Sequence, residues 1–300
     1  GRTLKFTYDT MTDGYIVDKD AVKYSGDKNW LKQLETLAIP NAFNGKPVTG
    51  IADGMLSGCS SMKELTLPDG LVYVGETAFY GCGELKYNKS ENGGLYLGSE
   101  NNGYLCLVYV KNKDCTVFSI DKNCRVICDE AFLDCNLLSD ITLPDSITRI
   151  GAQAFRNCDS LTNVYVPEGI LSVGSDAFLG CGNLEYNLYA PMKFLGDATG
   201  ERKYTVLVYG NSVSTTTLRM RERCVIADKA FADSEISQFE NVAGNLIIGN
   251  RAFKNCKNLT YVSIFYTEKI GNRAFEGCTA LKTVRLGEEL KSIGENVFKD

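Results

Sequence analysis

The side chains with the greatest capacity for chemistry are twelve cysteines, and the chain contains no histidine. Without histidine there is no Ser-His or Cys-His nucleophile arrangement and no zinc site that uses an imidazole ligand. A cysteine metal site would need two or more ligands within a short stretch, and no Cys-x-x-Cys occurs. No Gly-rich phosphate loop follows an expected strand. We therefore expect a protein that is not an enzyme and that uses no metal and no cofactor.

Charge and hydropathy argue against two further classes of protein. The formal net charge of the 300 residues is −5, which does not suit a nucleic-acid binder, because such a protein needs a basic stripe to meet phosphates. No run of 18 apolar residues occurs, so no transmembrane segment is expected. The chain opens with Gly-Arg-Thr, as a mature protein trimmed of its leader would. The lack of a leader in the sequence is therefore no evidence for a cytoplasmic location.

An internal repeat organises the chain and positions most of the cysteines. One copy reads IGAQAFRNCDSLTNVYVPEGILS over residues 150–172, and the phrase restarts at Val173. Each copy opens with an Ile or Val that we call the leader. Successive leaders lie 22 or 23 residues apart, except for two steps of 53 that carry 30 extra residues. The nine leaders are Ile51, Val74, Ile127, Ile150, Val173, Ile226, Ile248, Ile270 and Ile293.

The pattern inside each copy predicts its local structure. Val164 and Val166 lie on one side of residues 161–166, and this period of two indicates a strand with one buried face. The Ala-Phe-x-x-Cys segment is too short for a long helix, so we expect one helical or 3₁₀ turn there, with the Phe buried. A single copy cannot bury its own apolar residues, whereas stacked copies can. The sequence therefore predicts an α/β fold, a solenoid of stacked strand-plus-short-helix repeats.

Seven cysteines occupy one fixed position of the repeat, three residues after the Phe, where Ser234 is an exception. At that position we expect small buried apolar side chains with free thiols. Stacked equivalents could come within disulfide reach, but their side chains would run parallel. Four further cysteines lie in the extra segments: Cys106, Cys115, Cys124 and Cys224. The sequence leaves open whether two of them form a disulfide.

The remaining segments are a start without the repeat and two insertions. In residues 1–47, LKFTY and YIV flank Asp13-Gly14, which indicates a hairpin within an N-terminal β cap. The solenoid then covers residues 48–300, with insertions near 88–117 and 187–216, and the whole forms one structural domain. The insertions resemble each other at offsets of 98 to 100 residues and read as a β-hairpin plus a strand. They either extend the sheet or form binding protrusions.

The phrase IGxxAFxxCxxLxxVxLP resembles the BspA-type leucine-rich repeat, and IPNAFNGKPVTGI resembles the usual entry of that family into its first repeat. The resemblance covers about residues 37–300. Its departures are Ala52, Met55, Leu56, Ser234 and the two insertions. The family occurs mainly in surface and secreted proteins of anaerobic bacteria and some protozoa. The resemblance implies an extracellular or cell-surface leucine-rich-repeat solenoid that binds other macromolecules, sometimes as an adhesin toward host proteins. It implies no catalytic residue.

The candidate binding site is the exposed face of the stacked strands, and Tyr165, Tyr261 and Arg285 lead because aromatic and Arg side chains are typical interface anchors. We expect a monomer that binds a protein or a glycan. The alternative is a structural spacer that presents another part of a longer surface protein. An intracellular signalling scaffold and a carboxylate hydrolase are further hypotheses. The candidate face consists of Glu64, Thr66, Asp140, Thr142, Asn163, Tyr165, Tyr261, Ser263, Thr283 and Arg285.

Overall fold

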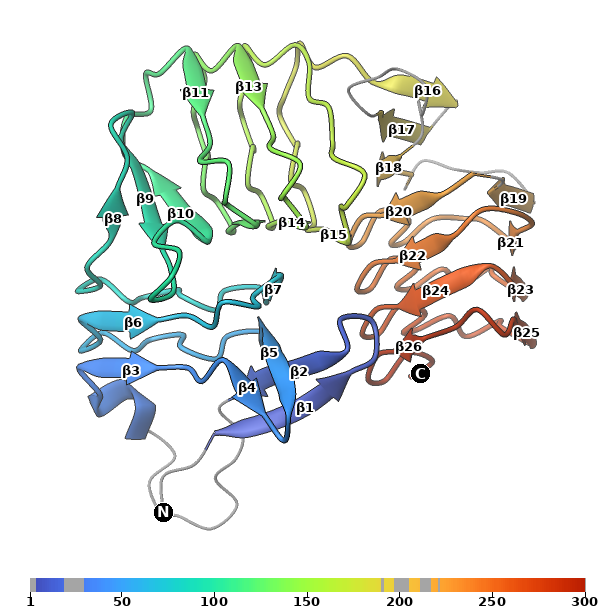
Figure 1. Cartoon of the computed structure of the whole chain (residues 1–300). Helices are drawn as coiled ribbons and strands as arrows, with labels where there is room; N and C mark the ends of the chain where they lie inside the picture. The colour runs from blue at the N-terminus through green and yellow to red at the C-terminus, as the bar shows by residue number, and fades with distance from the viewer. Residues whose placement is uncertain are drawn as a thin grey trace.

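A computed structural model describes residues 4–18, 30–189, 192–196, 205–210, 217–220 and 222–299. The chain coils into stacked rungs, and the stack bends round until its two ends meet (Figure 1). Two rows of parallel strands follow the stack. The inner row, which contains the leaders, faces the middle of the ring, and the outer row faces away from it (Figure 1).

The inner row is built from short strands because only the two or three residues around each leader pair with the next rung. Val126 pairs with Arg149 and Ile127 with Ile150, so the leaders stack on one another. The leaders from Ile51 to Ile270 are buried, whereas Ile293 in the last rung is 53% exposed. Several residues that precede a leader, such as Tyr73, Ser172 and Lys269, line the space inside the ring. The inner strands are β5 (Lys46–Ile51), β7 (Tyr73–Val74), β10 (Cys106–Val110), β12 (Val126–Ile127), β14 (Arg149–Ile150), β15 (Ser172–Val173), β18 (Val206–Tyr209), β20 (Cys224–Ile226), β22 (Leu246–Ile248), β24 (Thr267–Ile270) and β26 (Ser292–Ile293).

The outer row carries the alternating V-x-L phrase of the repeat. It falls into three separate ladders, of which the longest joins four strands in the order β19-β21-β23-β25. The outer strands are β3 (Thr36–Ala38), β6 (Glu64–Thr66), β11 (Val117–Ser119), β13 (Asp140–Thr142), β19 (Thr217–Met220), β21 (Gln238–Asn241), β23 (Tyr261–Ile264) and β25 (Thr283–Leu286).

The α/β assignment with a short helix in each repeat was wrong. Between the two rows each Ala-Phe-x-x-Cys segment forms consecutive turns, which together we call the turn row. The backbone φ is positive at two positions of each segment, for example 58° at Glu130 and 61° at Asp134, and this alternation prevents a helix from propagating. The freed N–H groups donate to the next rung, as from Phe132 to the Ala154 oxygen at 2.7 Å. The fold is a β-solenoid.

The core runs through the middle of the stack. Phe132, Phe155 and Phe178 are fully buried, and their rings stack with centroids 4.8 and 5.2 Å apart. The repeat cysteines cap this stack, because the thiol of Cys158 donates to the Phe132 oxygen of the preceding rung at 3.3 Å. All twelve cysteines are free, and all except Cys115 are buried.

Each insertion supplies a rung of its own. In the first insertion, β8 (Asn88–Lys89), β9 (Gly94–Leu97) and β10 form an antiparallel meander, and β10 then pairs in parallel with β12, with Leu107 opposite Ile127. In the second, β16 (Asn187–Tyr189) and β17 (Met192–Leu195) precede β18, which pairs with β20 and sets Leu207 opposite Ile226. Leu107 and Leu207 therefore act as leaders without the rest of the phrase.

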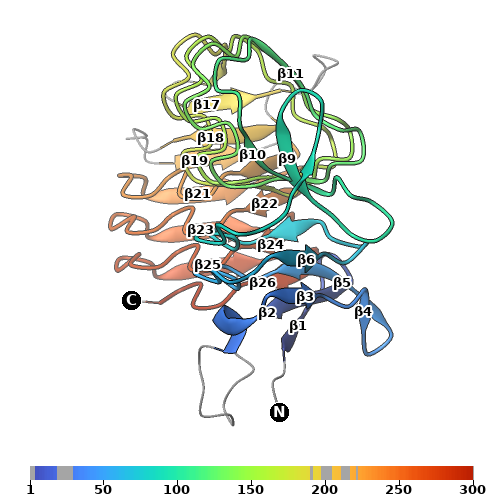
Figure 2. The same cartoon turned by 90° about the vertical axis from the view of Figure 1, so that its left-hand side faces the viewer.

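The N-terminal segment forms the predicted hairpin and closes the ring. Strands β1 (Lys5–Asp9) and β2 (Gly14–Asp18) are antiparallel, and β2 joins β5 in parallel. A second hairpin, β4 (Ala42–Phe43) with β5, turns through Asn44 and Gly45 at φ 47° and 76°. A 3₁₀ helix, η1 (Trp30–Gln33), buries Trp30 and Leu31. The hydroxyl of Thr10 hydrogen-bonds the Lys291 oxygen, and Figure 2 shows the N-terminal and C-terminal strands at the same end of the molecule.

Candidate functional site

The ten residues of the candidate face lie in the outer row, on the outside of the ring (Figure 1). Glu64 and Thr66 belong to β6, Asp140 and Thr142 to β13, and the other strand residues to β23 and β25. Asn163 and Tyr165 are exposed but lie in an extended segment without strand pairing. The face is therefore divided, because the outer row pairs continuously only within each of its three ladders.

Strands β19 to β25 form the largest uninterrupted part of this face, and their register brings equivalent positions into rows. Tyr261 pairs with Thr283, and Ser263 pairs with Arg285. The guanidinium of Arg285 lies 5.7 Å from the centroid of the Tyr261 ring, a cation–π arrangement on the exposed face. The strand also contradicts one expectation: Ser263 is buried, at 8% exposure. Its short side chain lies between Glu240 and Arg285, which are longer.

Charged groups on the outer row are mostly paired with one another. Arg219 Nε lies 2.7 Å from the Glu240 carboxylate, and Lys86 Nζ lies 2.8 Å from that of Glu64. The hydrogen bond from Lys86 lowers the pKa of Glu64, so this carboxylate is ionised at neutral pH. Among the leading anchors, Tyr165 (52% exposed) and Arg285 are exposed, and Tyr261 is half-buried.

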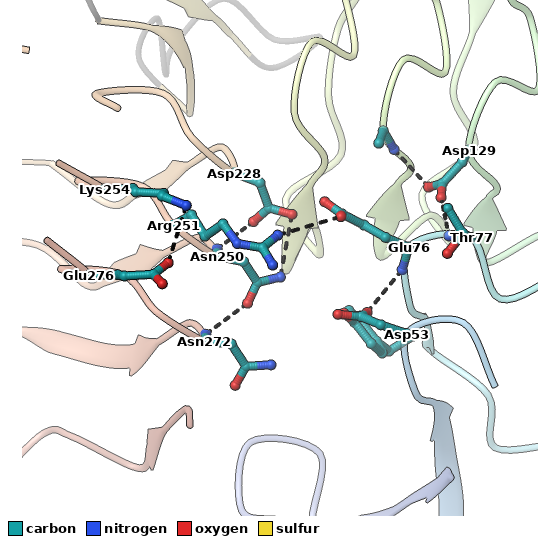
Figure 3. A network of polar contacts seen from close by, with 12 residues as sticks. Asp53, Glu76, Thr77, Asp129, Asp228, Asn250, Arg251, Lys254, Asn272 and Glu276 are labelled. Carbon is teal, nitrogen blue, oxygen red and sulfur yellow. Dashed lines mark hydrogen bonds and ion pairs between the residues drawn. The ribbon is translucent and has the colours of Figure 1, made fainter. Parts of the chain in front are cut away.

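A second polar site lies inside the ring and was missed from the sequence. Two residues after several leaders, an Asp or Asn side chain accepts the backbone N–H of the equivalent residue in the next rung (Figure 3). Asp228 Oδ1 accepts from Asn250 at 2.5 Å, and Asn250 Oδ1 accepts from Asn272 at 2.8 Å. This Asx ladder was visible as Asp or Asn at a fixed offset from the leader: Asp53, Asp129, Asp228, Asn250 and Asn272.

Arg149 is the buried cation of this inner site. Its side chain is 1% exposed, its guanidinium lies 4.7 Å from the Tyr73 ring centroid, and Nη1 donates to Ser172 Oγ at 2.7 Å. Nη2 lies 3.9 Å from Asp129 Oδ1. Burial raises the pKa of Asp228 to about 7, although the nearby charge of Arg149 opposes the shift. The available sequence signal was a cation immediately before a leader, as at Arg149 and Lys269, where the other copies have uncharged residues.

The space inside the ring is small and is limited by the chain itself. A cavity of about 340 Å³ lies between the β1–β2 hairpin and the inner row, with Tyr8, Asp9, Tyr73, Asp228 and Lys269 among its lining residues. Carboxylates predominate in its lining, which has two ammonium groups, those of Lys5 and Lys269, beside Asp9, Asp18, Asp53, Asp228 and Glu295. Among the described residues, no three Cys, Asp or Glu side chains gather as a metal site would require.

Membrane insertion through a helix finds no support in the described residues, since none of their helical segments has the length and apolar character that a bilayer span demands. The fold and the surfaces just described define a repeat protein of the leucine-rich class, with a short period, a buried Phe stack and an exposed strand row.

The family model described as "BspA type Leucine rich repeat region" matches six copies at residues 30–100, 108–194 and 224–300. The chain belongs to the BspA-type leucine-rich-repeat family. The match confirms the family that the repeat phrase predicted. No curated protein matches the chain.

Among solved structures, the chain is similar to a leucine-rich cell surface protein from Faecalibacterium prausnitzii A2-165 at 20% identity and a TM-score of 0.34, over 98% of this chain and 83% of that one. It is also similar to the leucine-rich-repeat protein of T. pallidum, at 20% identity and a TM-score of 0.30, over 93% and 88% of the two chains. A leucine-rich-repeat protein from Bacteroides ovatus ATCC 8483 matches at 20% identity and a TM-score of 0.29, over 99% and 90%.

Proposed function

We propose that the protein is a non-enzymatic binding module outside the cell, and that it binds a protein ligand through the outer row. The observation that carries the proposal is the uninterrupted ladder β19-β21-β23-β25, which presents Tyr261, Thr283 and Arg285 on one rigid surface. Membership of a family that occurs mainly in surface and secreted proteins supports the location.

The closed ring favours the outer row over the inner one. Curved repeat proteins commonly bind ligands on their concave side. Here the β1–β2 hairpin occupies the mouth of the ring and Thr10 hydrogen-bonds Lys291, so a macromolecule has no free access to the inner strands. The outer row has no such cover among the described residues, and aromatic and Arg anchors of the kind that dominate interfaces are exposed on it.

The test is a binding screen of the purified chain against extracellular-matrix proteins and a glycan array. A variant with Tyr165→Ala, Tyr261→Ala and Arg285→Ala is measured beside a control with Leu137→Ala and Lys257→Ala, which removes an exposed apolar group and a cation elsewhere. Loss of anchors typically costs at least about 10-fold in affinity each.

We expect saturable binding to a matrix protein that the triple variant loses and the control keeps. Absence of any saturable binding would contradict the proposed function and favour the spacer alternative. Binding that the triple variant retains in full would remove the ligand site from the outer row, and binding to glycans alone would replace the proposed ligand class.

A further inference from the structure

Two grooves open in the turn row, one beside each insertion. The first has a volume of about 620 Å³, and it runs between residues 74–83 of one rung and Asp129, Glu130 and Leu133 of another, with Tyr109 among its lining residues. The second has a volume of about 500 Å³ and runs between residues 178–182 and 228–230, with Tyr209 in the equivalent place.

The first groove arises because the inserted rung beside it does not complete the turn row. In the first insertion, the N–H of Val110 donates to Ala131 as an ordinary rung would, but the next N–H, that of Lys111, donates to the Gly93 oxygen in the hairpin. The backbone therefore turns away before it forms an Ala-Phe segment. The neighbouring Phe79 shows the gap, because it stacks on no aromatic ring of the described residues, unlike Phe132 on Phe155.

The wall of the first groove carries backbone donors that other rungs use. Where ordinary rungs adjoin, the N–H groups three, five and seven residues after the leader donate to carbonyls of the next rung, as from Asp134 to Arg156 at 2.9 Å. At the groove, the first equivalent N–H, that of Thr77, donates to the Asp129 carboxylate at 2.7 Å. The N–H groups of Phe79 and Gly81 have no acceptor among the described residues. Unpaired backbone donors in a row are a template for another chain.

The lining of the first groove recurs in the second, which makes an accidental gap a poor explanation. The two grooves lie one internal period apart in the sequence, and their lining residues correspond at offsets of 99 or 100. The corresponding pairs are Thr77 and Asp176, Phe79 and Phe178, Gly81 and Gly180, Cys82 and Cys181, Gly83 and Gly182, Tyr87 and Tyr186, Val108 and Val208, Tyr109 and Tyr209, and Asp129 and Asp228.

We propose that each groove binds an extended peptide segment of a partner protein. The peptide takes the place of the missing turn segment: its carbonyls accept from the N–H groups of Phe79 and Gly81, and its side chains pack against Tyr87 and Tyr109. This is strand addition, in which backbone hydrogen bonds give affinity and side-chain pockets give specificity. The grooves are separate from the outer row, so this inference does not rest on the function proposed above.

Charge distinguishes the two grooves and selects the peptide. Glu76, Asp129 and Glu130 line the first groove together with a single ammonium, that of Lys229. Arg251 and Arg149 pair with Glu76 and Asp129, which leaves Glu130 to attract a cation. The first groove therefore takes a peptide with a Lys or Arg. In the second groove Lys229 stands where the first has Glu130, and the Nζ of Lys193 lies 4.9 Å from the Tyr186 ring centroid. The two ammonium groups accompany two carboxylates, those of Asp176 and Asp228, so a basic residue is less favoured there than in the first groove.

Two glycines allow each groove to be filled without disturbing the rung. A Cβ on Gly83 would meet no atom within 4 Å, and one on Gly182 would meet only the Asp159 carboxylate at 3.7 Å. Neither glycine has a positive φ. Gly83→Trp is designed to fill the first groove and Gly182→Trp the second, so each variant is the matched control of the other. Tyr109→Ala, at a side chain 41% exposed, is a second variant that removes a packing surface instead of adding one.

The probe is a phage-displayed library of random peptides of roughly 12 residues, selected on the whole chain, with the enriched peptides then labelled and titrated by fluorescence anisotropy. We expect one basic family of peptides whose affinity falls about 30-fold or more in Gly83→Trp, the loss of two hydrogen bonds and some packing. Tyr109→Ala should weaken the same family, and Gly182→Trp should leave it unchanged. The outer-row triple variant should also bind it normally.

Failure of the library to enrich any peptide would overturn the proposal. So would enriched peptides that bind both tryptophan variants as well as they bind the wild-type chain. Peptides whose binding is lost only in the outer-row triple variant would also overturn the groove proposal, and they would support the outer-row site. The two claims can therefore fail separately.

Discussion

Replacing Asp228 with Asn should stabilise the protein increasingly as the pH rises. Asp228 is 3% exposed, and burial raises the pKa of its carboxyl from 3.8 to about 7. The Asx ladder needs only the side-chain oxygen that accepts the Asn250 N–H, and Asn already fills this role at Asn250 and Asn272. Asp228→Asn thus keeps the hydrogen bond and removes a charge that the folded site disfavours.

The magnitude and sign follow from proton linkage. Below pH 3.8 the carboxyl is protonated in both the folded and unfolded states, so it gives no pH-dependent difference. Between pH 3.8 and about 7 the unfolded chain is ionised and the folded chain is not, so the wild type loses stability as the pH rises. A shift of this size corresponds to roughly 4 kcal/mol, which is fully expressed above pH 7.

The assay is the denaturation midpoint in urea for wild type and Asp228→Asn from pH 4 to pH 9, with exposed Asp159→Asn as the control. We expect the advantage of Asp228→Asn to grow from pH 4 to about 7 and then to level off, while the control stays flat. A difference that does not change with pH, or a variant that loses stability at high pH, would refute the assignment of a buried, disfavoured carboxylate. The second outcome would show that the ionised Asp228 stabilises Arg149.

Three further predictions concern the stack. Phe155→Ala should lower the free energy of unfolding by about 3–5 kcal/mol, because this ring is fully buried between two others. Phe298→Ala should lower it far less, because Phe298 is 41% exposed, and denaturant titration compares the two variants. Gly151→Ala should cost roughly 1–3 kcal/mol, since its Cβ would lie 2.4 Å from the backbone of the preceding rung, while Gly83→Ala, in open space, should be nearly neutral by thermal melting. Ellman's reagent should modify Cys115 first, as the one cysteine that is not buried, and equal rates for all thiols would contradict the buried ladder.

The sequence was sufficient to predict that the repeats stack and that most candidate residues face outward. A period of two distinguishes the buried side of a strand from the exposed side, and a period of about 23 identifies equivalent positions in successive rungs. It was insufficient for the turn row. Alternating φ is recognisable when Gly occupies the positions, but Glu130 and Asp134 adopt positive φ here without that signal. The helical expectation failed for this reason.

The inserted rungs escaped recognition because Leu107 and Leu207 lack the phrase that identifies a leader. The position after the leader is Gly in most copies but not in all, and the structure gives a physical reason. The residue after the leader is Gly where an ordinary rung precedes it, as at Gly151, because any Cβ would strike that rung. Cys128 and Ala227 occupy this position immediately after the inserted rungs, whose leaders Leu107 and Leu207 pair with Ile127 and Ile226.

The inner site and the two grooves depend on curvature and on how the ends meet, which follow from small rotations at every rung and not from any single motif. Arg149 and Tyr73 are 76 positions apart in the sequence, and only the bend of the stack brings them together. The repeat pattern also gives no sign that the pairing of the outer row is interrupted beside both insertions.

The most direct test of the central claim is the hydrogen-exchange footprint of the chain in complex with the matrix protein that binds it best in the screen. Binding through the outer row predicts slowed exchange in β21, β23 and β25 and unchanged exchange in the β1–β2 hairpin. Protection of β22 and β24 with faster exchange in the hairpin would contradict the account, because it would show that the ring opens and that the ligand binds inside it.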